Sequence, residues 1–146
     1  GGRGNTASGY FSTVAGGKCN CASSNYSTVG GGGSLVGPGN SALGNYSTVA
    51  GGGGFFAGGN IASGSQSFIG GGSYNTVSGA KSTIVGGCCN TNTHGNSHII
   101  GSNITSVSGN MLHANTLYLS AAALPIADPG VPGVVLNDSG TLKISL

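Results

Sequence analysis

Residues 5–17 read NTASGYFSTVAGG, and close variants of this stretch recur through most of the chain. Aligned on the Ser-Thr-Val triplet, the pattern returns at intervals of 15, 20, 20, 15 and 15 residues. An Asn lies seven positions before each triplet, and in the first five units an Ala or a Val follows that Asn by two positions. Fixed spacing of this kind is typical of repeat architectures. The units begin near residues 5, 20, 40, 60, 75 and 90, and a degenerate copy begins near 105.

Each unit predicts two short β-strands, one around the Ala and one around the Val, separated by corners that are rich in Gly. Two strands in a unit of 15 residues make one rung of a parallel β-solenoid, whose rungs stack about 4.8 Å apart. We therefore expect an all-β fold in which about seven rungs occupy residues 1–114. The Ala column and a β-branched column should face each other inside, and the β-branched column contains Val14, Val29, Val49, Ile69, Ile84 and Ile99.

The interior of such a rung is thin. One Val and one Ala bury little apolar surface at about 25 cal/mol per Å², whereas ordering the backbone costs roughly 1–2 kcal/mol per residue. Gly, Ser, Asn and Thr account for 78 of the 146 residues, which leaves few side chains to add to this core. We therefore expect chains to pack on one another. Two columns are placed on the packing face by strand alternation: one includes Thr13, Thr28, Thr48, Phe68, Thr83, His98 and His113, and the other includes Phe11, Tyr26 and Tyr46.

The repeat resembles the head repeats of trimeric autotransporter adhesins of the YadA type. The resemblance covers roughly residues 5–114 and lies in the pattern, since the units here are longer than the family's. It implies a homotrimeric left-handed parallel β-roll.

Two of the intervals are five residues longer than the basic unit, and both extra segments fall at the same corner. Adjacent rungs should therefore project two neighbouring loops, which carry Leu35 and Val36 in one and Phe55 and Phe56 in the other. These apolar residues either pack against a neighbouring chain or form an exposed recognition patch. Tyr26 and Tyr46 are further candidates for receptor contact, because exposed aromatic rings can stack on sugars.

The repeat pattern is lost in residues 115–146. Residues 116–120 alternate as a strand does, and two apolar stretches at 133–136 and 141–145 flank an Asn-Asp-Ser-Gly turn, which predicts a small β-hairpin. Residues 124–145 resemble the short terminal segment of many structural proteins of tailed phages and large viruses. This resemblance favours a virion fibre over a bacterial surface protein.

Catalytic chemistry finds little support in the composition. Residues 1–127 contain no Asp or Glu, so neither a carboxylate pair nor a Ser-His-acid triad can be assembled there. Four scattered Lys and Arg residues make no stripe for nucleic acid, and no run of about 20 apolar residues predicts membrane insertion. We expect no enzyme activity, no catalytic residues and no cofactor.

Histidines and cysteines are the remaining candidates for metal or redox chemistry. His98 and His113 are expected in one column, where a threefold axis could gather imidazoles around a transition metal or an anion; alternatively, they replace Thr on a packed face. Cys19 and Cys89 also share a column, but four rungs separate them by about 19 Å, too far for a disulfide. Buried filler or interchain disulfides are expected instead for Cys19, Cys21, Cys88 and Cys89.

The leading functional hypothesis is a section of a homotrimeric virion fibre, from a phage tail or head. It would contact a host surface glycan or protein, adjoin other fibre or baseplate proteins, and bind through many weak contacts. The alternative is the head of a bacterial trimeric surface adhesin, or another extracellular fibre, at the cell surface. Ice binding is a third hypothesis, suggested by the Thr ladder but disfavoured by its breaks at Phe68 and His98. Because the chain begins at Gly1 and not at Met, we expect it to be a fragment or a processed product.

Overall fold

The protein is described by a computed structural model that covers residues 1–56, 58–117, 135–138 and 141–144. The chain divides into two compact units, Gly1–Asn115 and Thr116–Leu146. All regular elements in the described residues are β-strands, and these residues include no helix that could cross a membrane.

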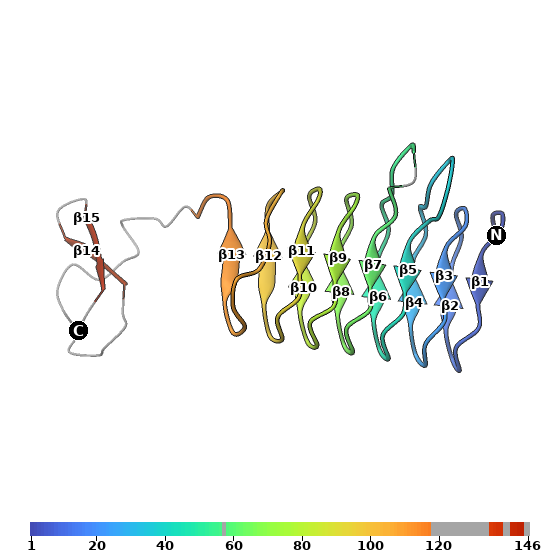
Figure 1. Ribbon diagram of the computed structural model, residues 1–146, viewed down its shortest axis with the longest axis horizontal. Coiled ribbons are helices and arrows are strands. Elements are labelled where there is room, and N and C mark those ends of the chain that lie inside the picture. The colour runs from blue at the N-terminus through green and yellow to red at the C-terminus, as the bar shows by residue number, and fades with distance from the viewer. Residues whose placement is uncertain (57, 118–134, 139–140, 145–146) are drawn as a thin grey trace. The chain divides into compact units, whose positions relative to one another are not determined.

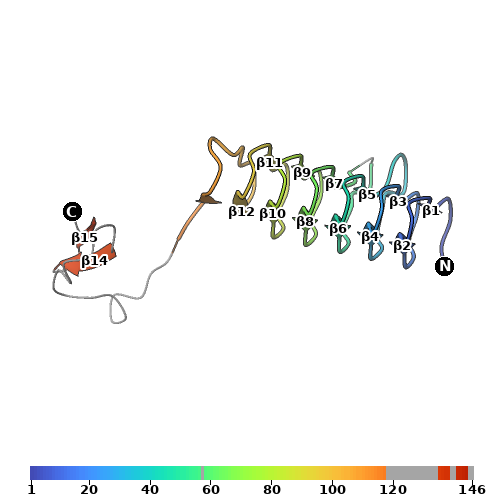
Figure 2. The same ribbon diagram turned by 90° about the horizontal axis from the view of Figure 1, so that it is seen from below.

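The first unit is a β-solenoid in which successive rungs give short strands to two parallel sheets, and the last rung gives β13 to the second sheet only (Figure 1). One sheet has the order β1-β3-β5-β7-β9-β11 and the other β13-β12-β10-β8-β6-β4-β2. Figure 2 shows the two rows of strands running along the solenoid. The strands are β1 (Thr6–Ala7), β2 (Thr13–Val14), β3 (Cys21–Ala22), β4 (Thr28–Val29), β5 (Ser41–Ala42), β6 (Thr48–Val49), β7 (Ile61–Ala62), β8 (Phe68–Ile69), β9 (Thr76–Val77), β10 (Thr83–Ile84), β11 (Thr91–Asn92), β12 (His98–Ile100) and β13 (Leu112–Ala114).

The core lies between the two sheets and consists of the two columns expected from the repeat. The prediction of inward Ala and β-branched columns is confirmed from Ala22 to Val77 in the first column and from Val29 to Ile99 in the second, where the side chains are fully buried. In the first rung, Val14 is half-buried and Ala7 is exposed. The buried apolar residues are Ala22, Val29, Ala42, Val49, Ala62, Ile69, Val77, Ile84 and Ile99.

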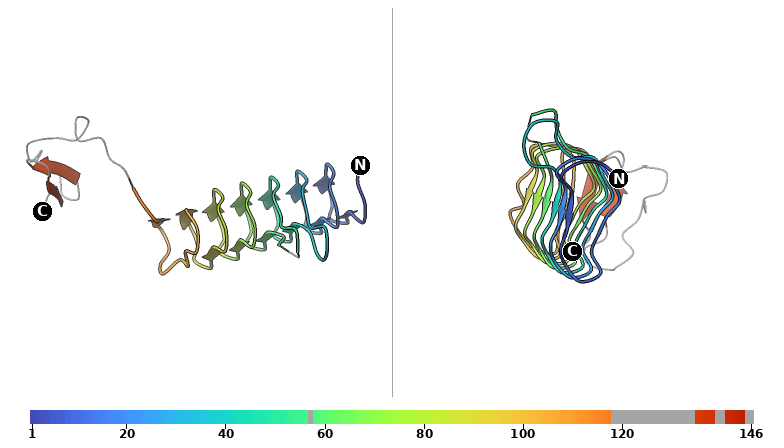
Figure 3. Two further views of the ribbon diagram at one scale, coloured as in Figure 1. Left: turned by 90° about the horizontal axis from the view of Figure 1, so that it is seen from above. Right: turned by 90° about the vertical axis from the view of Figure 1, so that its right-hand side faces the viewer.

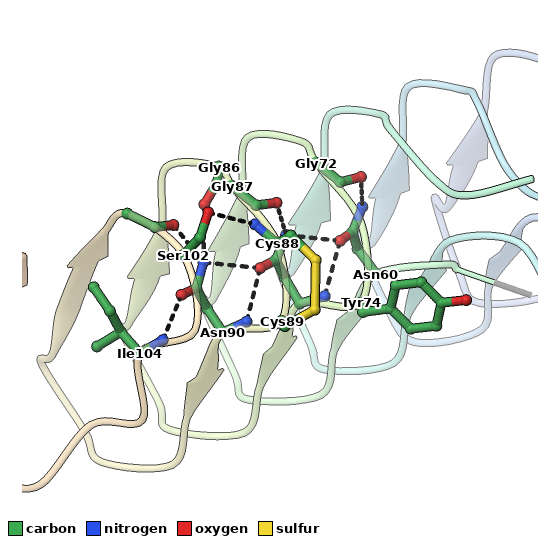
Figure 4. The surroundings of a disulfide bond; sticks show 12 residues. Asn60, Gly72, Tyr74, Gly86, Gly87, Cys88, Cys89, Asn90, Ser102 and Ile104 are labelled. Carbon is green, nitrogen blue, oxygen red and sulfur yellow. Dashed lines mark hydrogen bonds between the residues drawn. A yellow bond between two sulfur atoms is a disulfide. The ribbon is translucent and has the colours of Figure 1, made fainter. Parts of the chain in front are cut away.

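A ladder of buried asparagines runs along one corner of the solenoid and contains Asn20, Asn40, Asn60, Asn75 and Asn90. The repeat pattern located these residues but did not predict what they do. The backbone N–H of Asn40 donates to Oδ1 of Asn20 at 2.9 Å, and the N–H of Asn60 donates to Oδ1 of Asn40 at 2.9 Å. Each amide nitrogen in turn donates to glycine carbonyls of the neighbouring turns, as Asn60 Nδ2 does to Gly51 and Gly72 at 3.1 and 3.0 Å. Figure 4 shows the ladder continuing to Asn90. These side chains supply the hydrogen bonds that buried corner backbone requires.

Two columns of corner residues adopt positive φ although they are not glycine. One column precedes the ladder asparagine, and the other precedes the buried serine of the second strand. The second column contains Phe11, Tyr26, Tyr46, Gln66, Lys81 and Asn96. Strand alternation therefore does not apply to the aromatic column, which lies in a turn and not on the strand face that carries the Thr ladder.

In the second unit, β14 (Val135–Asp138) and β15 (Thr141–Ile144) pair antiparallel. This confirms the expected hairpin pairing but moves its bounds, because Asn137 pairs with Leu142 and Asp138 with Thr141 inside the ladder. Only residues 139–140 separate the strands in sequence. The strand expected at 116–120 is not formed at Thr116 and Leu117, and its other residues lie outside the described ranges.

Candidate binding site

Two adjacent loops, of which the structure describes residues 34–38 in one and 54–56 and 58 in the other, leave the solenoid at one corner and are called the paired loops. Figure 1 shows them extending beyond the other corners, and the end view in Figure 3 shows them on the same side. They are joined by a parallel bridge between Val36 and Phe56, in which the N–H of Val36 donates to the carbonyl of Phe55 at 3.3 Å. The expectation of two neighbouring projecting loops is confirmed.

The apolar side chains of the paired loops face solvent in the single chain. The exposed fractions are 53% for Leu35, 57% for Val36, 64% for Phe55 and 67% for Phe56. The rings of Phe55 and Phe56 meet edge to face, with centroids 4.7 Å apart. Four large apolar side chains on one projection make the kind of patch that proteins use for contacts.

Both loops are tied to the body of the solenoid. The Tyr74 hydroxyl donates to the carbonyl of Phe56 at 2.5 Å, and Lys18 Nζ donates to the carbonyl of Leu35. The Tyr74 ring also lies against the loop backbone, since a Cβ placed on Gly58 would come within 2.9 Å of it. These contacts hold the loops in a defined position.

A pocket of about 220 Å³ lies at the base of the paired loops, on the outer face of the first sheet. Three consecutive strands form its floor through Ser41, Ile61 and Thr76, which pair in register as Ser41 with Ile61 and Ile61 with Thr76. Pro38 and Tyr74 also line the pocket. The sequence indicated the loops but not this pocket, because it depends on Tyr74 from the next rung.

The other receptor candidates, Tyr26 and Tyr46, belong to a stack of exposed rings. Tyr26 lies 5.0 Å from Phe11 and 4.9 Å from Tyr46, with interplanar angles of 17° and 2°. Neighbours therefore cover both faces of the Tyr26 ring, which leaves its edge to solvent. A sugar cannot stack on Tyr26 in this arrangement, and Tyr46 has one face free of aromatic neighbours.

The expectation that His98 and His113 share a column is wrong. His98 pairs with Leu112, and His113 pairs with Ile99 in the β-branched column. The last interval is 14 residues because Gly101 stands where the preceding corner has Gly86 and Gly87. Among the described residues, no group of three or more His, Cys, Asp or Glu could hold a metal ion.

The four cysteines differ from expectation as well. Cys88 and Cys89 form a disulfide between neighbours, drawn in Figure 4, and Cys89 is exposed. Cys19 and Cys21 are free and half-buried. Buried filler is therefore wrong for all four, because Cys19, Cys21 and Cys88 are only partly buried and Cys89 is exposed. The sequence predicted buried filler or disulfides between chains, and did not predict a disulfide between adjacent residues of one chain.

Comparison with known proteins found no matching family model and no significant match to a curated protein. The geometry of the solenoid, the paired loops and the pocket is therefore the basis for a functional proposal.

Proposed function

We propose that this chain is a section of a homotrimeric virion fibre that contacts the host cell surface. The observation that carries the proposal is the pair of anchored loops, which hold Leu35, Val36, Phe55 and Phe56 more than half exposed. A stiff repeat body with an apolar projection suits attachment, since a recognition loop on a rigid scaffold loses little freedom on binding. The resemblance of the C-terminal segment to virion proteins supports the location.

The outer face of the second sheet supports association of chains. Phe68, Val85, Ile100 and Leu112 lie along it with exposed fractions of 39%, 53%, 49% and 52%. An apolar row of this length on a body with a thin core favours burial against sister chains. Three chains in a left-handed trimeric roll, as the repeat resemblance implies, would each present paired loops, and their weak contacts would add as avidity.

The attachment role is tested by binding of the labelled chain to intact cells of candidate hosts. The double variant Phe55→Ser with Phe56→Ser should bind at least tenfold less, because it removes the exposed rings while leaving the rungs unchanged. Val107→Ser is the matched control, since Val107 is 78% exposed and lies away from the loops. Equal binding by both variants would reject a recognition role for the loops.

A further inference from the structure

The pocket at the base of the paired loops combines features of a sugar site. Its floor presents two hydroxyl groups, Ser41 Oγ and Thr76 Oγ1, on either side of the Ile61 side chain. Neither hydroxyl makes a hydrogen bond to any residue in the described part of the chain, although Ser41 and Thr76 are both half-buried. Each of these hydroxyl groups can therefore donate a hydrogen bond to a polar ligand and accept one from it, while Ile61 offers an aliphatic contact between them.

The spacing of these hydroxyls limits the size of the ligand. Ser41 and Thr76 are two strands apart, which corresponds to about 10 Å. A ligand that bridges both hydroxyls over the Ile61 side chain forms a hydrogen bond of about 2.8 Å at each end, so its own two oxygens must lie at least about 4 Å apart. Non-adjacent hydroxyls of one six-membered sugar ring meet this condition, whereas adjacent hydroxyls do not. The volume of about 220 Å³ is also below the roughly 300–1,000 Å³ of pockets for drug-sized ligands.

The walls complete this chemistry. Tyr74 is 51% exposed and lines the pocket, while its hydroxyl is already committed to the carbonyl of Phe56. The ring is therefore held in place before any ligand arrives, and it offers an apolar surface to the C–H groups of a sugar. Pro38 contributes a second rigid apolar group from the other loop. Within the described part of the chain, no Lys, Arg, His, Asp or Glu lines the pocket, so an ionised ligand would lose its hydration there without gaining a charged partner.

We propose that this pocket binds one neutral hexopyranose unit of a surface polysaccharide. The inference rests on the proposed attachment function and names the ligand class for it. The paired loops would then contact the remainder of the receptor, while the pocket selects a single uncharged sugar ring.

The test is saturation-transfer NMR on the intact chain with the methyl glycosides of glucose, galactose and mannose. We expect at least one to bind with a dissociation constant on the order of 1 mM, and glucuronate to fail to compete. Thr76→Val, which removes one hydroxyl at nearly constant shape, should weaken binding about threefold to tenfold. Thr91→Val is the matched control, because Thr91 follows Thr76 in the same column but lies outside the pocket.

Tyr74→Ala should abolish binding, with circular dichroism confirming that the solenoid is retained. The proposal is overturned if none of the three glycosides shows saturable transfer, if Thr76→Val and Thr91→Val behave alike, or if glucuronate competes equally well. The particle mass, measured on the same sample, tests the proposed trimer independently of sugar binding. A trimer that binds no sugar rejects only the pocket, whereas a monomer that binds sugar rejects only the trimer.

Discussion

At the scale of single residues, the asparagine ladder is the strongest determinant of the corner. Asn60 Oδ1 accepts the backbone N–H of Asn75 at 3.1 Å and the Asn75 side-chain amide at 3.0 Å, while Asn60 Nδ2 donates to two glycine carbonyls. The side chains of Asn60 and Asn75 are fully buried, so water cannot replace these hydrogen bonds. Losing one asparagine therefore leaves several backbone groups without partners.

We predict that Asn60→Ala lowers the free energy of unfolding by about 2–4 kcal/mol, since each unsatisfied buried group costs about 1–3 kcal/mol. Urea denaturation followed by circular dichroism measures this loss. Asn45→Ala is the control, because Asn45 is exposed in a turn, and it should change stability by less than about 0.5 kcal/mol. Similar losses in the two variants would contradict the ladder's role.

Residue patterns predicted the core but not the corners, for a physical reason. A column that is β-branched in every rung, as Val29, Val49 and Ile69 are, gains hydrophobic free energy from burial at each rung, so its inward position follows from residue type. Tyr26 and Lys81 adopt positive φ, which their side chains disfavour, so residue type gave no sign of it. The buried asparagines likewise resemble ordinary turn residues in sequence, because Asn fits both environments.

At the scale of the rung, close approach of neighbouring backbones explains why some corner glycines are required. A Cβ on Gly64 would lie 2.2 Å from the carbonyl oxygen of Gly79 in the next rung. A Cβ on Gly71 would meet nothing within 4 Å. Gly64 is therefore required for steric reasons, whereas the position of Gly71 has room for a side chain.

We predict that Gly64→Ala destabilises the solenoid by about 1–3 kcal/mol, because the rungs must separate locally to admit the methyl group. Gly71→Ala should be neutral or stabilise the chain by up to about 1 kcal/mol, since it restricts the unfolded state. Melting temperatures of the two variants, measured side by side, check the difference. If Gly71→Ala melted at or below Gly64→Ala, steric crowding between rungs would not be the cause.

The rung scale also shows where extrapolation of the repeat ends. Strand positions followed from the period as far as β12, but the next strand begins at Leu112, one residue earlier than a 15-residue period places it. Ile104 occupies the position of the next ladder asparagine, and its backbone N–H donates to Oδ1 of Asn90 at 3.0 Å. A single shortened corner thus moved His113 out of the column that holds His98. The sequence did not predict the pocket either, because the pocket combines residues of two loops with a side chain from a third rung.

At the scale of the whole molecule, the question is what covers the outer face of the second sheet. Val85 and Ile100 are half exposed there and follow the inward Ile84 and Ile99, so alternation directs them outward. The proposed trimer would bury this row, and the hydrophobic gain would be shared by every rung that carries an apolar residue on it. Association should therefore depend on this face and not on the paired loops.

We predict a particle mass of three times 13.9 kDa for the intact chain by light scattering coupled to size exclusion. The double variant Val85→Ser with Ile100→Ser should shift the population to monomer and lower the melting temperature, because two apolar contacts per chain are replaced by hydroxyls that desolvate at a cost. Phe55→Ser with Phe56→Ser should keep the trimer mass, since those rings belong to the proposed receptor contact. A monomeric wild-type chain would contradict association through this face, and dissociation of the loop variant would instead place the loops between chains and remove them as receptor contacts.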